Sequence, residues 1–369
     1  MRAAVLFGPD QPFAIRDVSV DKPGPREVLV RVAASGLCHS DYHFRNGDLP
    51  FIAPSVLGHE AAGVVEAIGS EVRAVAVGDH VVGCASSFCG HCDPCVTGRT
   101  HICGSRPQRR EGEPSRLNLD GVRLSQGAQL GGYAEQMLVH ENAVVRVPRE
   151  LPLDRGALLG CGVLTGLGTV FNSARVTAGS KVAVVGCGGV GLSVVQGARI
   201  AGADQIIAID RMPEKLELAR HFGATDVVSG GPDVVSEVRE LSRGGVDFSF
   251  EVIGLPQTMV QAIEMLAPSG LMTIVGAMRF DATIPLPGTA MLRHEWRVQG
   301  ALMGSSAFTR EIPRFAAMYL KGKLDLDTLI AERISLPEIN DGFETMLGAR
   351  QARSVITFPD VLEAAARSA

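Results

Sequence analysis

Aromatic residues and unbalanced charge are scarce in this sequence. Phe, Tyr and Trp make up 5% of the 369 residues, with a single Trp, and 35 basic against 40 acidic residues give a formal net charge of −5. This balance opposes a broad surface for nucleic acid or for an acidic membrane. Apolar residues at 46% and charged residues at 20% exclude a largely disordered chain.

Long hydrophobic runs and a secretory signal are also lacking. The apolar stretch at the N-terminus is too short for a signal peptide and soon meets Pro9 and Asp10. The uncharged stretches 156–174 and 182–198 approach the length of a membrane span, but they are rich in glycine and lack flanking Trp or Tyr. We therefore expect a cytoplasmic protein without a membrane partner.

Glycine and cysteine, by contrast, are in excess. The chain has 43 glycines and eight cysteines, and the glycines amount to about 12% where about 7% is usual. In a reducing cytosol, cysteines serve as metal ligands, redox groups or small buried hydrophobes more often than in disulfides. The spacing of the cysteines has to separate these uses.

The length suggests about two domains, and changes of pattern divide the chain into three zones. Short Val-rich runs cut by turn signals extend to about residue 160, which is typical of a mostly antiparallel β region. From about 163 to 302, strand patterns alternate with helical ones, as in a doubly wound α/β fold with a parallel sheet. From about 303 the pattern is mixed, and we expect the tail to return to the first zone.

The expected elements follow from these patterns. Strands are expected at 27–33, 62–68, 80–83, 143–147, 181–185, 205–209, 248–252, 271–275 and 354–358. Helices are expected from about 190, from 213 and near 310–321. The predicted domains are 1–162 together with 303–369, and 163–302 between them.

The middle zone contains a dinucleotide-binding fingerprint, G-x-G-x-x-G, between an expected strand and an expected helix. Its glycines are Gly186, Gly188 and Gly191, and Gly189 and Val190 lie within the same loop. The helix N-terminus supplies N–H donors and a positive dipole for a pyrophosphate. The alternative is a glycine-rich turn without a ligand.

An acidic residue follows this fingerprint at the end of the next expected strand. Asp210 can accept hydrogen bonds from both hydroxyls of an adenosine ribose and would repel a 2′-phosphate, which favours NAD over NADP. The neighbouring Arg211 leaves some use of NADP open.

Four cysteines lie close together in the segment 84–104. Cys89, Cys92, Cys95 and Cys103 form the pattern C-x2-C-x2-C-x7-C. Four thiolates close a tetrahedral zinc site without an open position, so this zinc is expected to be structural. An iron–sulfur cluster is the alternative, but its bacterial motif has a shorter last gap followed by proline. A nucleic-acid-binding zinc ribbon is a further alternative, which the net charge and the lack of interleaved aromatics oppose.

A third group of candidates is scattered along the chain. Cys38, His59 and Cys161 lie in three separate segments. Spacing alone does not bring them together, and taken singly a cysteine is more often a small buried hydrophobe.

The motif Gly58-His59-Glu60-x-x-Gly63, continuing to Gly69 and Val72, matches the zinc signature of a known family at every fixed position. With the four-cysteine segment and the fingerprint in the family's order, the chain resembles the zinc-dependent alcohol dehydrogenases of the medium-chain dehydrogenase/reductase superfamily. The resemblance covers essentially the whole chain. It implies a GroES-like catalytic domain, a Rossmann NAD-binding domain and two zinc ions per chain.

The resemblance also assigns roles to single residues. Cys38, His59 and Cys161 would bind a catalytic zinc with an open fourth position, and Glu60 would lie behind the metal or bind it transiently. Ser40 would take the alcohol proton and pass it through the nicotinamide ribose to His43. Asp41 would hydrogen-bond a zinc ligand, His59 being the expected one. The coenzyme would be contacted near the nicotinamide by Thr165 and Val190, near the adenosine ribose by Lys215, and at the pyrophosphate by His39 and Arg353.

The substrate channel departs from the family's mammalian members, which have bulky side chains there. Ala85, Ala277 and Leu302 hold three of these positions, so we expect a roomy pocket for aromatic, medium-chain or secondary alcohols. The alternative enzyme is a thiol-dependent formaldehyde dehydrogenase, in which His39 also occurs. An alternative of another class is a non-catalytic protein that binds NAD and zinc. The length of the loop after Cys103 favours a homodimer over a tetramer, and Cys84 and Cys187 are left as free thiols.

Overall fold

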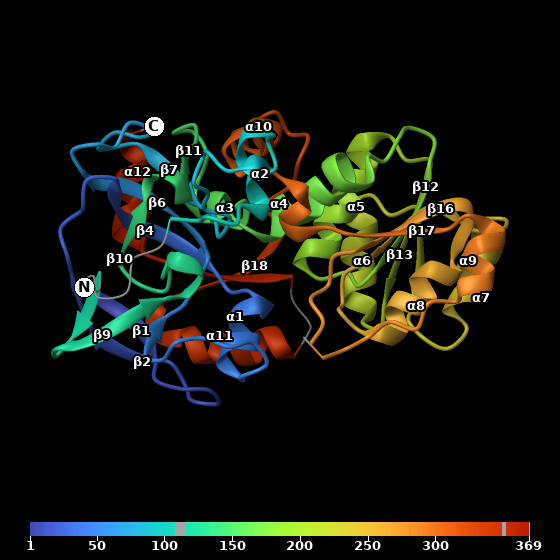
Figure 1. Ribbon diagram of the computed structural model, residues 1–369, viewed down its shortest axis with the longest axis horizontal. Helices are drawn as coiled ribbons and strands as arrows, with labels where there is room; N and C mark the ends of the chain where they lie inside the picture. Colours follow the sequence, from blue (N-terminus) through green and yellow to red (C-terminus); the bar gives the residue numbers. More distant parts are fainter. Residues whose placement is uncertain (108–115, 280, 349–351, 369) are drawn as a thin grey trace. The chain divides into compact units, whose positions relative to one another are not determined.

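The computed structural model describes residues 1–107, 116–279, 281–348 and 352–368. The chain divides into two compact units, Met1–Leu164 with Ala307–Ala369, and Thr165–Ser306. The predicted combination of a mostly antiparallel β region and a parallel α/β region is confirmed (Figure 1). Among the described helices, none is both long enough and apolar enough to cross a bilayer.

The first unit contains two sheets. One has the strand order β11-β7-β6-β4-β19-β18, with β10 also paired to β4. The other has the order β2-β1-β5-β9-β8-β3. Their strands are β1 (Arg2–Leu6), β2 (Ala14–Asp17), β3 (Ser19–Val20), β4 (Glu27–Gly36), β5 (Ser55–Val56), β6 (Glu60–Ile68), β7 (His80–Gly83), β8 (Leu117–Leu119), β9 (Val122–Gln126), β10 (Gln136–His140), β11 (Val144–Arg146), β18 (Ile330–Ile334) and β19 (Arg353–Thr357).

The first sheet joins β4, from the early part of the chain, to β19, from its last part. β19 pairs antiparallel with β4, where Val355 lies opposite Gly36, so blue and red strands belong to one sheet (Figure 1). A strand of the tail therefore pairs with a strand of the first zone. Most pairings here are antiparallel, as expected from the alternating Val-rich runs; β18 with β19 and β5 with β9 are parallel.

Short helices connect and cover these strands. They are α1 (His39–Arg45), α2 (Asp93–Val96), α3 (Leu153–Leu158), α10 (Phe308–Leu320), α11 (Ile339–Leu347) and α12 (Pro359–Ser368), with α4 (Gly162–Gly168) running into the second unit. The chain leaves β4 for α1 and leaves α3 for Cys161, and these two junctions carry residues of the site described below.

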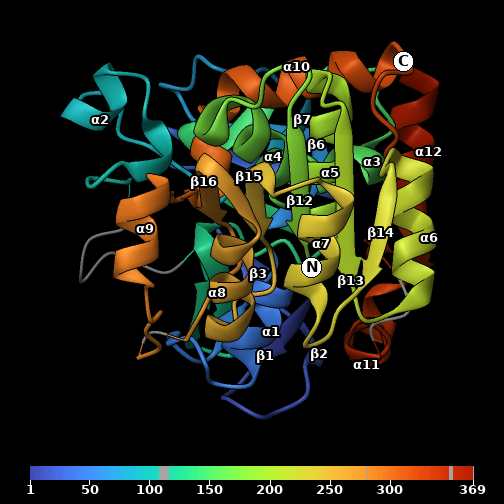
Figure 2. The same ribbon diagram turned by 90° about the vertical axis from the view of Figure 1, so that its right-hand side faces the viewer.

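The second unit is a parallel sheet with the strand order β14-β13-β12-β15-β16-β17. Figure 2 shows its strands with the helices packed along them. The strands are β12 (Lys181–Val185), β13 (Gln205–Asp210), β14 (Asp226–Ser229), β15 (Val246–Glu251), β16 (Leu266–Ile274) and β17 (Arg297–Gly300). The helices are α5 (Gly189–Ala201), α6 (Pro213–Phe222), α7 (Val234–Leu241), α8 (Pro256–Glu264) and α9 (Gly288–His294).

Apolar, β-branched runs explain this sheet. Val182 and Val184 on β12 are fully buried, as are Ile207 and Ala208 on β13, because strands covered on both faces read as continuous hydrophobic runs. The predicted start of β16 was wrong: this strand begins at Leu266, five residues before the predicted start at 271. Pro268 and Ser269 break the apolar pattern of β16 without ending the strand, and the φ of Ser269 is +61°.

Glu251 holds the end of β15 to the start of α8. Its side chain is fully buried, and its Oε1 accepts hydrogen bonds from Ile253 N (3.0 Å), Gly254 N (2.8 Å) and Thr258 Oγ1 (2.7 Å). The carboxylate thus satisfies two backbone donors in the loop between β15 and α8.

We predict that Glu251→Ala lowers the free energy of unfolding of the second unit by about 2–4 kcal/mol, because buried donors lose a charged acceptor. Urea unfolding followed by fluorescence of Trp296, the single tryptophan, measures this unit directly. Glu264→Ala, at an exposed position of α8, is the control. It should change the free energy of unfolding by less than about 0.5 kcal/mol. Equal values for the two variants would contradict the role of Glu251.

Candidate metal and coenzyme sites

Four potential metal ligands converge inside the first unit. Cys38 directly precedes α1, His59 and Glu60 lie at the start of β6, and Cys161 follows α3. Their ligand atoms all lie within 4.8 Å of one another. Cys38 and His59 are buried and Glu60 is completely inaccessible. The structure thus brings together residues that sequence spacing alone left apart.

Two glycines allow the segments to approach so closely. Gly58 has a φ of +95°, and a Cβ there would lie 2.6 Å from the ring and backbone of Tyr133. A Cβ at Gly160 would lie 2.4 Å from the Gly83 carbonyl oxygen. The residues immediately before His59 and Cys161 are therefore glycines for steric reasons.

The Asp41 carboxylate orients the His59 imidazole. Its Nδ1 lies 3.0 Å from Asp41 Oδ2, which leaves Nε2 for a metal. The same Asp41 oxygen accepts a hydrogen bond from the Tyr133 hydroxyl (2.7 Å), and Gly58 N donates to Oδ1 (3.3 Å). Burial and the Asp41 carboxylate raise the pKa of Tyr133 well above its usual range, so the phenol remains a donor at neutral pH. Sequence reasoning missed Tyr133 entirely.

Glu60 forms an ion pair with Arg353 of β19. Its second oxygen, Oε1, is buried and has no hydrogen-bond partner among the described residues. A buried carboxylate oxygen without a donor, beside two sulfurs and an imidazole, fits a divalent cation such as zinc. The pairing with Glu60 was not predicted for Arg353, and its predicted role at the pyrophosphate stays a prediction.

The surroundings of Cys38 favour its thiolate form. A hydrogen bond from Cys161 lowers the pKa of Cys38 well below its ordinary value despite the opposing effect of burial. The thiolate is the form that binds metals.

A second cluster consists of Cys89, Cys92, Cys95 and Cys103, the cysteines of the predicted zinc lobe. The Sγ atoms of Cys92 and Cys95 are 3.4 Å apart, those of Cys92 and Cys103 3.7 Å, and those of Cys89 and Cys95 3.8 Å. Zinc–sulfur bonds of about 2.3 Å in a tetrahedron place sulfurs about 3.8 Å apart. The cluster therefore fits a closed zinc site.

Backbone amides around this cluster favour thiolates. The N–H groups of His91 and Cys92 donate to Cys89 Sγ, at 3.5 and 3.4 Å. The amide of His91 is the largest cause that lowers the pKa of Cys89 to about 6.

The glycine-rich loop of the second unit has the form that a dinucleotide needs. Gly186 has a φ of +100°, and a Cβ at Gly191 would lie 1.8 Å from the Gly186 carbonyl oxygen. A Cβ at Gly188 would meet nothing within 4 Å, so the backbone before α5 is open to a ligand. Gly189 and Val190 form the first turn of α5 and are partly exposed. These residues would hold a pyrophosphate at the helix N-terminus.

Asp210 ends β13 beside this loop. Its Oδ2 accepts a hydrogen bond from Cys187 N (2.8 Å) and its Oδ1 from Met212 N (3.0 Å). The carboxylate is thereby fixed in place with lone pairs left for ribose hydroxyls. Arg211 is exposed and Lys215 is partly buried.

The remaining predicted residues are placed within one unit or the other. In the first unit, Ser40 and Ala85 are partly buried, His39 is exposed, and His43 Nδ1 lies 2.9 Å from Asp48 Oδ2. In the second unit, Thr165 is buried with its Oγ1 3.8 Å from Met303 Sδ, whereas Ala277 and Leu302 are exposed. Their roles toward coenzyme and substrate stay predictions.

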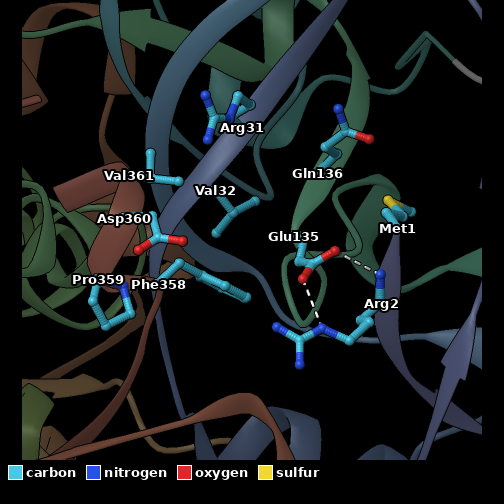
Figure 3. Close-up of a pocket in the computed structure, with 10 residues that line it drawn as sticks. All are labelled: Met1, Arg2, Arg31, Val32, Glu135, Gln136, Phe358, Pro359, Asp360 and Val361. Carbon is cyan, nitrogen blue, oxygen red and sulfur yellow. Dashed lines mark hydrogen bonds and ion pairs between the residues drawn. The ribbon is translucent and has the colours of Figure 1, made fainter. Parts of the chain in front are cut away.

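A cavity of about 400 Å³ also occurs in the first unit (Figure 3). It is lined by residues of the chain's beginning, β4, β10 and the start of α12, none of which is a cluster residue. Within it Glu135 accepts hydrogen bonds from the Arg2 backbone (2.7 Å) and side chain (2.8 Å). This cavity is separate from both groups of ligands.

A mostly β unit with two thiolate-rich metal clusters, and a parallel α/β unit with a dinucleotide loop, define the class of zinc-dependent dehydrogenases. Two family profiles match the chain. The one described as "Alcohol dehydrogenase GroES-like domain" covers residues 24–149, and "Zinc-binding dehydrogenase" covers 189–319.

Individual relatives agree with these profiles. S-(hydroxymethyl)glutathione dehydrogenase of Escherichia coli O6:H1 is 36% identical over 368 residues, covering 97% of this chain and 99% of its own. The structure of an alcohol dehydrogenase zinc-binding domain protein from Burkholderia ambifaria is 36% identical, covers 97% of this chain and 98% of its own, and has a TM-score of 0.93. Benzyl alcohol dehydrogenase from Acinetobacter calcoaceticus is 32% identical, with coverages of 97% and 99% and a TM-score of 0.92.

The chain therefore belongs to the zinc-dependent alcohol dehydrogenases of the medium-chain dehydrogenase/reductase superfamily. It is an oxidoreductase that acts on small molecules.

The two cysteines outside the clusters should be inert. Burial raises the pKa of Cys84 to about 11 and that of Cys187 to about 12, so little thiolate exists at pH 8. We predict that an alkylating reagent at pH 8 leaves both unlabelled in the folded, zinc-loaded protein, as mass spectrometry of the peptides will measure. Unfolding in urea is the control and should expose all eight cysteines. Rapid labelling of Cys84 or Cys187 before unfolding would contradict this assignment.

Proposed function

We propose that this enzyme transfers a hydride between NAD and an alcohol larger than ethanol, namely an aromatic, medium-chain or secondary alcohol, giving an aldehyde or ketone. The observation that carries the proposal is the buried convergence of Cys38, His59, Glu60 and Cys161. Small or exposed side chains at Ala85, Ala277 and Leu302 support a roomy pocket. The similarity to a benzyl alcohol dehydrogenase points the same way.

In this proposal, Cys38, His59 and Cys161 hold the catalytic zinc and Glu60 lies close enough to exchange onto it. The bound zinc would act as a Lewis acid that stabilises the alkoxide form of the alcohol. Asp41 accepts a hydrogen bond from His59 Nδ1–H and so fixes the tautomer that offers Nε2 to the metal. The four cysteines from Cys89 to Cys103 hold the second, structural zinc.

Ser40 and His43 are proposed to carry the alcohol proton outward. Both lie on α1, the helix that begins directly after the ligand Cys38. Ser40 would accept the alcohol proton while its own hydroxyl proton moves on, and His43 would receive the proton at the end of this relay. The Asp48 carboxylate, 2.9 Å from His43 Nδ1, orients the ring, and the His43 side chain is exposed enough to pass the proton to water.

NAD is proposed as the coenzyme, bound at Gly186, Gly188, Gly189, Val190 and Gly191. Asp210 supports this choice, because a fixed carboxylate accepts from ribose hydroxyls and repels a 2′-phosphate. Arg211 and Lys215 would lie near the adenosine ribose, Thr165 near the nicotinamide, and His39 and Arg353 toward the pyrophosphate.

A second candidate substrate is the S-hydroxymethyl adduct of formaldehyde with a thiol such as glutathione or mycothiol. The identity of 36% to S-(hydroxymethyl)glutathione dehydrogenase favours it. A non-catalytic protein would not require a buried set of Cys38, His59 and Cys161, so this third alternative is the weakest.

A cytoplasmic homodimer is the proposed form of the enzyme, with a tetramer as the alternative. β17 ends the order of the parallel sheet, so its outer edge offers backbone groups to a second chain. Leu286 and Leu292, before and within α9, are exposed, which suits a buried interface. All eight cysteines are free of disulfides in the structure, which suits a reducing compartment.

The substrate proposal predicts a higher kcat/KM for benzyl alcohol and octanol than for ethanol, measured as NADH formation across a panel of alcohols. Formaldehyde oxidation is measured in parallel, without thiol and then with glutathione or mycothiol. A thiol should make little difference. Strong turnover of formaldehyde that appears only with added thiol would favour the adduct instead, and a preference for ethanol would contradict the roomy pocket.

The coenzyme proposal is tested by Asp210→Asn, which keeps the shape of the side chain and removes its charge. We expect kcat/KM for NAD to fall about 10- to 100-fold, because a charged hydrogen bond contributes about 1.5–3 kcal/mol, and kcat/KM for NADP to rise. Asp233→Asn, the same change at an exposed position before α7, is the matched control. Unchanged preference in Asp210→Asn would contradict the role of Asp210.

A further inference from the structure

We propose that Tyr133 is a positioning residue of the catalytic metal site, because its hydroxyl fixes the carboxylate that orients His59. The inference rests on the proposed function, since it needs a catalytic zinc bound by His59. It extends the hydrogen-bonded chain behind that ligand by one member, from His59 through Asp41 to Tyr133.

The Asp41 carboxylate is the centre of this chain. It is 1% exposed and accepts three hydrogen bonds, from Tyr133 Oη at 2.7 Å, His59 Nδ1 at 3.0 Å and Gly58 N at 3.3 Å. The phenol makes the shortest of the three contacts, and it shares Oδ2 with the imidazole. A second, longer contact of 3.4 Å joins Oη to the Gly36 carbonyl oxygen. Donors on both oxygens fix the plane of the carboxylate and therefore the direction in which Oδ2 meets His59.

The Tyr133 ring is itself immobilised by aromatic neighbours. Phe13 packs edge-on against it at a centroid distance of 5.9 Å and Phe343 at 6.2 Å, while these two rings stack on each other at 5.4 Å. Asn340 anchors Phe13 through hydrogen bonds to its backbone N (3.0 Å) and O (2.9 Å). Residues from distant parts of the sequence thus determine where the hydroxyl lies.

The backbone of Tyr133 holds the same segment. Tyr133 N donates to the Leu57 carbonyl oxygen (2.9 Å) and Gly132 N to that of Gly58 (2.8 Å), directly before His59. Truncating Tyr133 to alanine would therefore disturb packing as well as the hydrogen bond. Tyr133→Phe removes the hydroxyl alone and keeps the ring among Phe13 and Phe343.

Without the hydroxyl, Asp41 keeps two donors but loses the shortest contact, so its carboxylate and the His59 ring gain rotational freedom. Residues that orient a metal ligand typically contribute 10- to 100-fold to metal affinity. A purely structural tyrosine would instead lower stability without singling out one of the two metals.

The experiment compares Tyr133→Phe, Asp41→Asn and the double variant with the wild type. Each protein is loaded with two zinc ions, and release to an excess of a colorimetric chelator is followed with time. Alkylation of Cys38 and Cys161, as against the four lobe cysteines, identifies by mass spectrometry which zinc has left. Tyr319→Phe is the matched control, because that phenol also contacts a carboxylate, Asp327, at 3.1 and 3.3 Å, away from the clusters.

We expect Tyr133→Phe to release the catalytic zinc about 10-fold faster or more, with the structural zinc and Tyr319→Phe unchanged. The double variant should release it no faster than Asp41→Asn, because the hydroxyl acts through that carboxylate. A rate within twofold of wild type, additive effects in the double variant, or equal acceleration of both zinc ions would overturn the inference. A wild type that binds only the structural zinc would overturn the proposed function, and the inference with it.

Discussion

The close packing of cysteine sulfurs in two clusters is the constraint on which this structure depends. Two groups of potential thiolates are gathered so closely that all ligand atoms of each group lie within 4.8 Å of one another. Thiolates at such distances repel strongly in a poorly solvated site, and a divalent cation converts that repulsion into attraction. Groups of the protein stabilise only part of this negative charge. They are the backbone amides that donate to Cys89 and the imidazole beside Cys38.

The fold of the first unit serves this convergence. β4 and β6 run antiparallel with Gly36 opposite Glu60, so Cys38, just after β4, and His59, just before β6, lie at the same end of the strand pair. Glycines at 58 and 160 remove the side chains that would keep the segments apart. Behind the ligands, Asp41, Tyr133 and Arg353 satisfy and orient the buried polar atoms. These contacts hold the ligands in place without a substrate.

Local signals in the sequence were sufficient for much of this. The run Lys181–Val185 followed by Gly186, Gly188 and Gly191 predicts strand, turn and helix because each feature depends on neighbours along the chain. The four lobe cysteines lie within 15 residues of one another, so their spacing alone predicts a shared metal. Cys38, His59 and Cys161 became a set only through the family resemblance, because long-range pairing of strands determines their proximity. Tyr133 and the pairing of Glu60 with Arg353 gave no local signal, since their partners lie 92 and 293 residues away.

The zinc content of the wild type and of Cys38→Ser tests the central claim most directly. The account predicts about two zinc ions per chain in the wild type and about one in the variant, which should keep its fold and lose alcohol oxidation. A wild type with one zinc, or a Cys38→Ser variant that keeps both its metal content and its turnover, would contradict the assignment of a catalytic zinc to Cys38, His59 and Cys161.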